Sequence, residues 1–224
     1  MTIISFIIPA LNEEINISNT LKSISDFTNF GEEFLTEVIV VDNGSIDSTV
    51  AIANSFDSVK TYVKPGISVA EMRNFGALKA AGSIYVFLDA DILLTSEWRN
   101  NIIPVLNGIT LEPMQVTGSN TVPPISNNLL LKYWFSGFSE KSIVDNIGSA
   151  HMIFGKNFFE SLGGFDARLE TAEDYDICCR ALKLGGKVQN EKKLIVFHMD
   201  FPMNIKDFMI REIWHGTGDC LDLK

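Results

Sequence analysis

The chain has 224 residues, and its 18 Lys and Arg against 28 Asp and Glu give a formal net charge of −10 at pH 7. A content of 46% hydrophobic and 21% charged residues is typical of a globular protein and excludes a disordered one. The longest basic cluster is Lys192-Lys193, so the sequence argues against a nucleic-acid partner. The acidic balance favours cations as ligands, or anions that arrive with a bridging cation.

Cysteine usage and the N-terminus indicate the compartment. The three Cys, two of them adjacent, fit neither a disulfide framework nor the spacing of a zinc site. The first residues lack the basic start of a signal peptide, and no apolar run reaches the roughly 18 residues that a membrane span needs. We therefore expect a cytoplasmic protein.

In the first half of the chain, short apolar runs alternate with amphipathic stretches. Their pattern predicts strands and helices in turn, at residues 3–9, 13–27, 37–41, 48–56, 60–63, 68–81, 84–88 and 96–106. Asp47 is predicted to cap the second helix, and Ser68 with Glu71 forms a capping-box pattern at the third. Repeated strand–helix units with apolar strands predict an α/β fold, a mostly parallel sheet flanked by helices.

The second half is less regular. Residues 118–128 are rich in turn formers and are expected to form a loop or a lobe boundary. The following residues, 129–138, are rich in large apolar side chains. Further on, the pattern predicts a helix at 174–184, a strand at 194–197 and a helix at 205–214.

Two carboxylates follow the predicted strand 84–88, at the end of a parallel sheet where ligands bind. Asp89 and Asp91 are two positions apart, so in an extended chain both can face one divalent cation, or one cation and a ribose. About one Asp-x-Asp is expected by chance in such a chain, and Asp174 and Asp176 form a second one. The position of Asp89 and Asp91 at the end of a strand, rather than their spacing, therefore indicates a ligand-binding role.

Two further polar residues lie near strand ends. Asp42 follows the strand 37–41 and could accept the imide N–H of a pyrimidine, although the Asn-Gly that comes next is a good turn in any case. Arg73 lies on the first turns of the helix 68–81. It is either part of a solvated helix face or a group that recognises a base carbonyl or a phosphate.

A second acidic group opens the predicted helix at 174–184. Acidic residues are favoured at this position by the helix dipole alone, so Glu173 and Asp174 have a structural explanation. The functional alternative is a general base, because the dipole and a nearby cation would keep an Asp ionised and able to take a hydroxyl proton. His198 closes the strand 194–197 and is either a structural residue or a cation ligand.

Five segments, at 5–14, 38–49, 70–82, 86–93 and 162–186, together and in this order resemble glycosyltransferase family 2, whose members have the GT-A fold. The resemblance covers residues 3–200 and implies one domain over 1–224, with a smaller acceptor-side lobe. Its nucleotide-sugar-binding half would be 1–94, and its acceptor-binding and catalytic half 95–224. Family members often continue further, so the sequence fits either a compact enzyme or one truncated at its C-terminus.

The resemblance also implies a reaction. One sugar would move, with inversion, from a nucleotide-diphosphate sugar, with UDP favoured, to an acceptor hydroxyl of a glycan or a lipid-linked acceptor. Asp174, in the segment that matches the family's Glu-Asp motif with Glu173, would be the catalytic base. Asp91 and Asp89 would hold Mn²⁺ or Mg²⁺, with His198 as a further candidate ligand. Nucleotide and sugar would contact Pro9, Ala10, Leu11, Glu13, Asp42, Arg73 (at the base), Asp89, Ala90 and Asp91.

Other functions fit less well. A sugar nucleotidylyltransferase would need a Gly-rich loop after the first strand, and a phosphohydrolase would need Thr or Val where Leu93 stands. The glutamine of the QxxRW element is missing before Arg211–Trp214, which favours one transfer per encounter over polymerisation. The alternative from another class is a nucleotide-sugar-binding subunit without transfer activity, for which Asp174 would be dispensable.

An apolar patch is the best candidate for a partner contact. It comprises Leu130, Tyr133, Trp134, Phe135 and Phe138. Core packing or a subunit contact explains such a patch. The sharper hypothesis is that it docks at the cytoplasmic face of a membrane, where a lipid-linked acceptor would lie.

Overall fold

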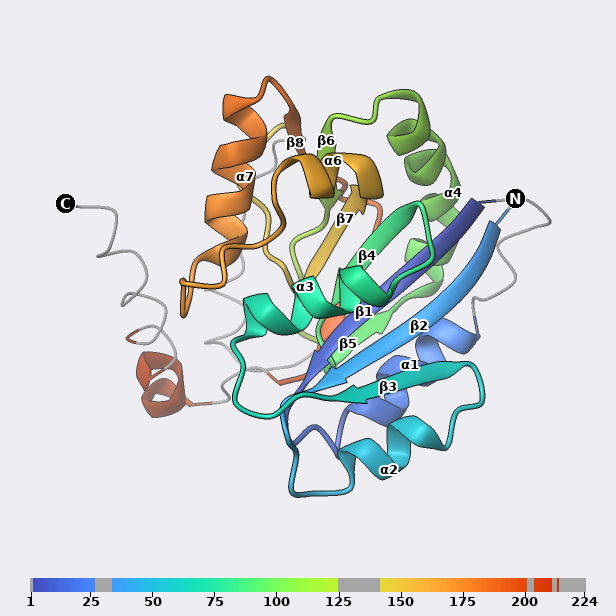
Figure 1. The fold of residues 1–224 in the computed structure, drawn as a ribbon, viewed down its shortest axis with the longest axis vertical. Coiled ribbons are helices and arrows are strands. Elements are labelled where there is room, and N and C mark those ends of the chain that lie inside the picture. The colour runs from blue at the N-terminus through green and yellow to red at the C-terminus, as the bar shows by residue number, and fades with distance from the viewer. Residues whose placement is uncertain (1, 27–33, 125–141, 201–203, 211–212, 214–224) are drawn as a thin grey trace.

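A twisted seven-stranded sheet organises the fold (Figure 1). The structure, a computed structural model, describes residues 2–26, 34–124, 142–200, 204–210 and 213. In these residues the strands lie in the order β3-β2-β1-β4-β7-β6-β8. Their bounds are Thr2–Ala10 (β1), Phe34–Asp42 (β2), Val59–Val63 (β3), Ile84–Leu88 (β4), Gln115–Gly118 (β6), His151–Gly155 (β7) and Lys187–Asn190 (β8).

The sheet is mostly parallel, as the sequence predicts. Strand β7 alone runs against its neighbours β4 and β6, and the other pairs in the sheet are parallel. A separate antiparallel pair joins β5 (Ile92–Leu94) to β9 (Val196–His198). This pair brings residues 196–198 back to the segment that follows β4.

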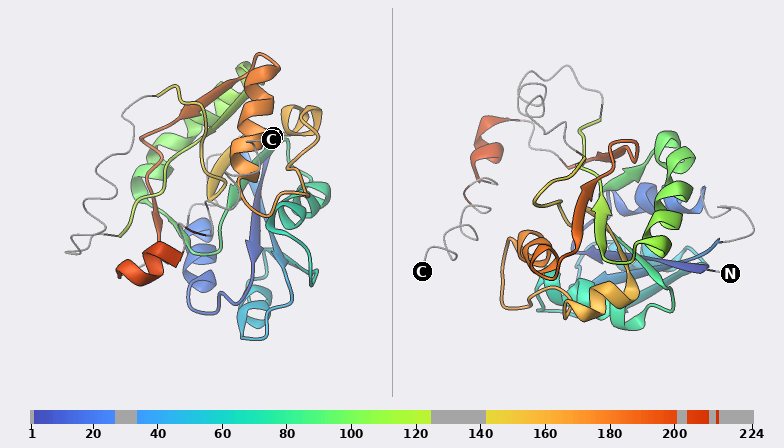
Figure 2. Two further views of the ribbon diagram at one scale, coloured as in Figure 1. Left: turned by 90° about the vertical axis from the view of Figure 1, so that its left-hand side faces the viewer. Right: turned by 90° about the horizontal axis from the view of Figure 1, so that it is seen from above.

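Helices cover both faces of the sheet (Figure 2). They are α1 (Ile17–Ser25), α2 (Thr49–Asn54), α3 (Val69–Lys79), α4 (Ser96–Leu111), α6 (Lys156–Ser161) and α7 (Glu173–Lys183). Side chains alternate across a strand, so Phe6 and Ile8 of β1 pack in the core with α1 and α4, while Ile7 packs in a second core with α3, α6 and α7. Burial on both faces explains the continuous apolar run of β1.

Two helix starts show how local chemistry sets the boundaries. The predicted helix at 13–27 begins only at Ile17, and the backbone N–H groups of Glu13 and Glu14 before it bind Thr49 and Asp47 of the neighbouring loop. The carboxylate of Asp47 also accepts the N–H of Thr49, the first residue of α2. The capping box of Ser68 and Glu71 at α3 is confirmed.

The sequence pattern predicts only some of the strands in the second half of the chain. Strands β6, β7 and β8 were missed because β6 and β8 are short and contain polar residues, which removes the apolar period, while β7 starts with a histidine. Residues 205–210 are helical, as expected. The apolar patch of Leu130 to Phe138 lies outside the described residues. Among the described helices, none combines the length and the hydropathy required to cross a bilayer.

Candidate functional site

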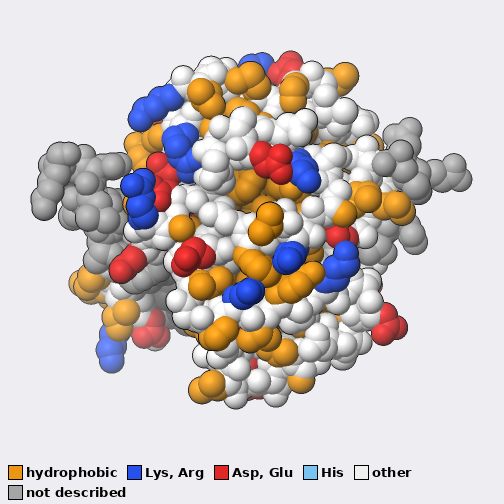
Figure 3. Space-filling view, in the orientation of Figure 1, with side chains coloured by type: hydrophobic (Ala, Val, Ile, Leu, Met, Phe, Trp, Pro, Cys, Tyr) orange, Lys and Arg blue, Asp and Glu red, His pale blue; other side chains and the backbone are white. Residues whose placement is uncertain are grey.

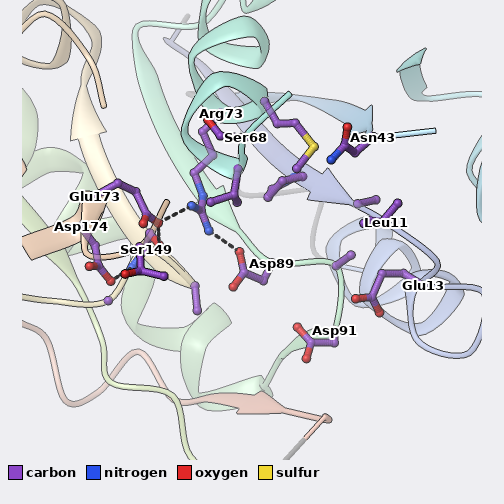
Figure 4. A pocket seen from close by; sticks show the side chains of 18 of the residues that line it. Leu11, Glu13, Asn43, Ser68, Arg73, Asp89, Asp91, Ser149, Glu173 and Asp174 are labelled. Carbon is purple, nitrogen blue, oxygen red and sulfur yellow. Dashed lines mark hydrogen bonds and ion pairs between the residues drawn. The ribbon is translucent and has the colours of Figure 1, made fainter. Parts of the chain in front are cut away.

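A cavity of about 750 Å³ lies where β1, β2 and β4 end and α3 and α7 begin (Figure 4). This is the edge of a parallel sheet where ligands bind, and the volume suits a ligand larger than a mononucleotide. Most of the residues singled out in the sequence line it, namely Pro9, Ala10, Leu11, Glu13, Arg73, Asp89, Ala90, Asp91, Glu173, Asp174 and His198. The fold therefore brings together two acidic groups that are more than eighty positions apart in the chain.

Asp42 does not lie on the cavity wall. Its side chain is buried, and its carboxylate accepts the backbone N–H groups of Gly44 and Ser45 at 2.9 and 2.8 Å and the hydroxyl of Ser45. The carboxylate thus shapes the turn that follows β2. The neighbouring Asn43 lines the cavity instead, with its amide held by the backbone of Ile67.

The loops after β1 and β2 are tied to each other. Asn12 receives the N–H of Ile46 on its side-chain oxygen and donates its own N–H to Ser45. Further hydrogen bonds join Glu13 to Thr49, Glu14 to Asp47, and Ser48 to Glu14. These two loops form one wall of the cavity as a single cross-linked unit.

Arg73 joins the two acidic groups of the site. Its guanidinium donates to Asp89 and to Glu173, each at 2.7 Å, and only 3% of its side chain is exposed. Burial lowers the pKa of Arg73, but the opposing charges of Asp89 and Glu173 raise it above its usual value. These partners differ from the base contact expected from the sequence. The Nε–H has no hydrogen-bond partner in the described structure, although it is buried.

Glu173 and Asp174 are held together by a residue that sequence reasoning missed. The hydroxyl of Ser149 donates to Glu173 at 3.0 Å, and the backbone N–H of Ser149 donates to the carboxylate of Asp174 at 3.2 Å. Figure 4 shows Ser149 next to the two acidic side chains. The N–H of Tyr175 binds the other oxygen of Asp174. Ser149 follows Gly148 in an irregular segment, and no motif marks it in the sequence.

The backbone before α7 is strained. Ala172, the residue before Glu173, has φ 63° and ψ 19°, in the left-handed region that a non-glycine residue rarely adopts. Such conformations persist where the surroundings fix them, and they gather at functional sites. The turn directs Glu173 back toward Arg73 at the start of the helix.

A second buried network joins Trp98, His151 and Ser119. The indole N–H of Trp98 donates to Nε2 of His151 at 2.9 Å, so Nδ1 holds the proton and faces the hydroxyl of Ser119 at 2.8 Å. Ser119 in turn donates to the carbonyl of Leu194. Burial lowers the pKa of His151 to about 3, so its imidazole is neutral.

Asp91 and His198 form the part of the site that suits a divalent cation. Their side chains meet at 2.7 Å between Oδ2 and Nε2. Burial and the charge of Asp91, with smaller effects of Asp200 and Asp89, raise the pKa of Glu13 to about 7. This excess of negative charge fits a cation. Among the residues that the structure describes, however, no three His, Cys, Asp or Glu side chains converge closely enough to hold a metal by themselves.

Mg²⁺ and Mn²⁺ sites of this kind are usually completed by substrate phosphates and water. Asp91 with His198 therefore fits a metal that arrives with a diphosphate better than it fits a permanently bound ion. Asp89 contributes differently, because one of its carboxylate oxygens already accepts Arg73. Of the three metal ligands expected from the sequence, the structure brings Asp91 and His198 into contact and pairs Asp89 with an arginine.

The fold is already known from solved structures. The structure superposes on a mannosyltransferase from Pyrobaculum calidifontis in complex with GDP-Man and Mn²⁺, with a TM-score of 0.77 and 18% identity over 96% of this chain and 62% of that one. It also resembles S. aureus TarS in complex with UDP-GlcNAc, with a TM-score of 0.66, 17% identity, and coverage of 90% and 59%. The fold is GT-A, as expected.

Sequence comparison agrees with the fold. Residues 5–112 match the model for glycosyl transferase family 2. The chain is 26% identical to glycosyltransferase AglE of Haloferax volcanii, over 81% of this chain and 62% of the relative. It is 24% identical to the pre-mycofactocin glycosyltransferase of Mycobacterium tuberculosis, over 80% and 40%. The match to glycosyltransferase family 2 thus covers the segment 5–112, and the chain spans about two fifths to three fifths of the length of these curated relatives.

Proposed function

We propose that this chain transfers one sugar from a nucleotide-diphosphate sugar, with UDP as the favoured nucleotide, to an acceptor hydroxyl of a glycan or a lipid-linked acceptor. The proposal includes inversion at the anomeric carbon and dependence on Mn²⁺ or Mg²⁺. The observation that carries it is the arrangement of Asp91 and Asp174 in one cavity, with Arg73 and Glu173 between the two sides. The proteins with similar structures bind GDP-Man with Mn²⁺, or UDP-GlcNAc.

The residues divide the cavity into a donor side and a base side. The cross-linked loops after β1 and β2, with Asn43, would hold the nucleotide, and Asp91 with His198 would hold the cation of its diphosphate. When bound, that cation would neutralise the charge that develops on the leaving diphosphate. We propose that residues 1–94 form the nucleotide-sugar-binding half and residues 95–224 the acceptor-binding and catalytic half. His198 is the exception, because it belongs to the second half but contacts Asp91 of the first.

Asp174 would act on the acceptor. Its carboxylate takes the proton of the acceptor hydroxyl while the oxygen forms a bond to the anomeric carbon and the bond to the diphosphate breaks. A single displacement from the opposite face inverts that carbon. The N–H groups of Ser149 and Tyr175 fix the orientation of the carboxylate, and a bound acceptor keeps water from taking its place.

A thermal-shift screen tests the donor half of the proposal. UDP, GDP, CDP and dTDP are each added with Mn²⁺ or with EDTA. A ligand at 100 times its dissociation constant adds about 2.7 kcal/mol to the free energy of unfolding. A Mn²⁺-dependent rise in Tm with one nucleotide is expected, and with UDP in the first place. The absence of a shift with all four would contradict the proposal.

Asp174→Asn tests the base and separates an enzyme from a binding subunit. We expect the variant to bind the nucleotide as the wild type does while transfer falls by about two to four orders of magnitude. Asp176→Asn, on the same helix, is the matched control because Asp176 pairs with Arg180, away from the cavity lining. Equal turnover in Asp174→Asn and wild type would remove Asp174 from the mechanism. Nucleotide binding without any transfer by the wild type would favour the non-catalytic subunit.

A further inference from the structure

Three side-chain polar atoms in the described residues are fully buried without a hydrogen-bond partner: Oγ1 of Thr61, Nε of Arg73 and Oγ1 of Thr171. Two of these residues, Arg73 and Thr171, line the same cavity. A buried group of this kind lowers stability, because the hydrogen bond to water that it loses on folding is not replaced. Thr171 lies three positions before Asp174, so its unpaired hydroxyl is next to the proposed base.

The start of α7 has two further unfavourable features. Its N-cap position is Ala172, which provides no side-chain hydrogen bond to the N–H groups of the first turn. Ala172 is also left-handed, with φ 63°, and this conformation is unfavourable for a residue that has a Cβ. Threonine, in contrast, is a favoured N-cap residue, and Thr171 stands one position earlier.

Extension of α7 by one residue at its N-terminus would remove all three defects. Thr171 would become the N-cap, and its hydroxyl would accept the N–H of Glu173 or Asp174. Ala172 would become the first helical residue and take a negative φ. In these three respects an extended helix suits the turn 170–172 better than the described start does.

Contacts with neighbouring segments hold the described conformation. Glu173 accepts the guanidinium of Arg73 at 2.7 Å and the hydroxyl of Ser149 at 3.0 Å. Residues 170–172 themselves form part of the cavity wall. A ligand that fills the cavity meets this turn directly, so it can favour one conformation of the turn over the other.

The extension would also change the environment of the base. In the described structure the N–H of Tyr175 donates to Oδ1 of Asp174 at 2.8 Å, and the N–H of Ser149 donates to Oδ2 at 3.2 Å. In a regular helix the N–H of Tyr175 binds the carbonyl four positions earlier, that of Thr171. Oδ1 would then be free for the acceptor hydroxyl. Loss of a hydrogen bond to the ionised form also makes a carboxylate a stronger base.

We propose that Thr171 is a positioning residue for Asp174. When a nucleotide sugar occupies the cavity, α7 extends by one residue, Thr171 caps the helix, and Oδ1 of Asp174 is released from the N–H of Tyr175. The inference rests on the proposed function, because Asp174 is a base only in that reaction. It adds a conformational step and the residue that controls this step, and it explains why the hydroxyl of Thr171 is unpaired in the described conformation.

Thermal unfolding with and without a ligand tests the proposal. Wild type, Thr171→Val and Thr171→Ser are measured alone and with Mn²⁺ and UDP-glucose, with GDP-mannose as a second probe. Thr171→Val replaces the unpaired hydroxyl by a methyl group of similar shape, so we expect the Tm without ligand to rise by about 2–4 °C. The ligand-induced rise in Tm should be smaller than in wild type, because valine cannot cap the extended helix. Thr171→Ser keeps the hydroxyl and should behave as wild type.

Thr61→Val is the matched control. The hydroxyl of Thr61 is also buried and unpaired, but it belongs to β3 and lies away from the cavity lining. We expect this variant to raise the Tm without ligand as Thr171→Val does, and to keep the ligand-induced rise of wild type. A role of Thr171 in stability alone would make the two valine variants alike.

Hydrogen exchange of residues 170–176 reports the conformational step directly. The ligand should slow amide exchange in this segment in wild type and in Thr171→Ser, because the first turn of α7 gains a cap, but not in Thr171→Val. Ala172→Gly provides an independent variant. Glycine adopts a positive φ readily, so it favours the described conformation and should also reduce the ligand-induced rise in Tm.

The results separate this inference from the proposed function. The inference fails if Thr171→Val lowers the Tm without ligand, or if it shows the ligand-induced rise in Tm and the slowed exchange of wild type. It fails equally if Thr171→Ser loses the response to ligand as Thr171→Val does. If none of the nucleotides or nucleotide sugars shifts the Tm of wild type, the proposed function itself is wrong, and the inference falls with it.

Discussion

Arg73 and Glu173, one hundred positions apart in the chain, form a buried ion pair at 2.7 Å. The same guanidinium holds Asp89, the residue that follows β4. One side chain of α3 thus ties the end of the central strand to the start of α7. The distance between the donor side and the base depends on this contact.

Replacing Arg73 tests how far the fold relies on it. Arg73→Met leaves Glu173 and Asp89 without their cation, and we expect the free energy of unfolding to fall by about 3–5 kcal/mol, the usual cost of an uncompensated buried charge. Urea unfolding measures it. Arg168→Met removes an exposed pair with Asp166 and should cost less than about 1 kcal/mol. Similar losses in both variants would show that the buried pair has no special role.

Ser149→Ala separates positioning from stability. The variant keeps the backbone N–H that binds Asp174 but loses the hydroxyl that binds Glu173. We expect kcat for transfer to fall about 10- to 100-fold through misplacement of the base, with the nucleotide Kd unchanged. Ser96→Ala is the control. It also removes a serine hydroxyl that donates to a glutamate, here Glu97, but it lies at the exposed start of α4. A kcat equal to that of the control would contradict the positioning role.

Gly76 lies where α3 packs closely against the sheet. A Cβ at this position would overlap Cγ2 of Ile7 in the buried strand β1. Although Ala is the better helix former, we expect Gly76→Ala to destabilise the protein by about 1–3 kcal/mol through overpacking. Gly108→Ala, in a helix with room for the methyl group, should be neutral or stabilising. Thermal unfolding of the two variants shows whether the signs differ as expected.

His151 predicts a pH dependence of stability. Its pKa is lowered by burial from 6.5 to about 3 in the folded protein. Below pH 6.5 the unfolded chain therefore binds a proton that the folded chain does not, so stability is lost as the pH falls. Between pH 7 and pH 5 this contributes a loss of about 2 kcal/mol. In urea unfolding at the two pH values, His151→Gln should lose about 2 kcal/mol less than wild type. An equal loss would refute the assignment.

The sequence predicts the fold and part of the site, for reasons that particular residues make clear. Strands β1 and β4 are buried on both faces, so their apolar runs are continuous and their ends, with Asp89 and Asp91, can be located. Ser149 and the true partners of Arg73 could not be found in this way. They depend on contacts between segments 24 and 100 positions apart, and such contacts leave no periodic signal.

The distribution of Lys and Arg on the surface agrees with the lack of a long basic cluster in the sequence. On the face shown in Figure 3, Lys and Arg side chains are scattered among hydrophobic and acidic ones and form no continuous basic stripe. Phosphate-backbone binding needs such a stripe. That the protein does not bind nucleic acid remains a prediction. A filter-binding assay with single-stranded and duplex DNA can check it.

The hydrogen bonds between the loops after β1 and β2 have a kinetic and thermodynamic consequence. Loops that are cross-linked in this way have little conformational freedom to lose when a ligand arrives, so the entropic penalty of association on this wall is small. A rigid wall of this kind needs no rearrangement before docking, and encounter can lead directly to a bound state. Selection among ligands therefore falls to the opposite wall, where the irregular segments before β7 and α7 meet the incoming molecule.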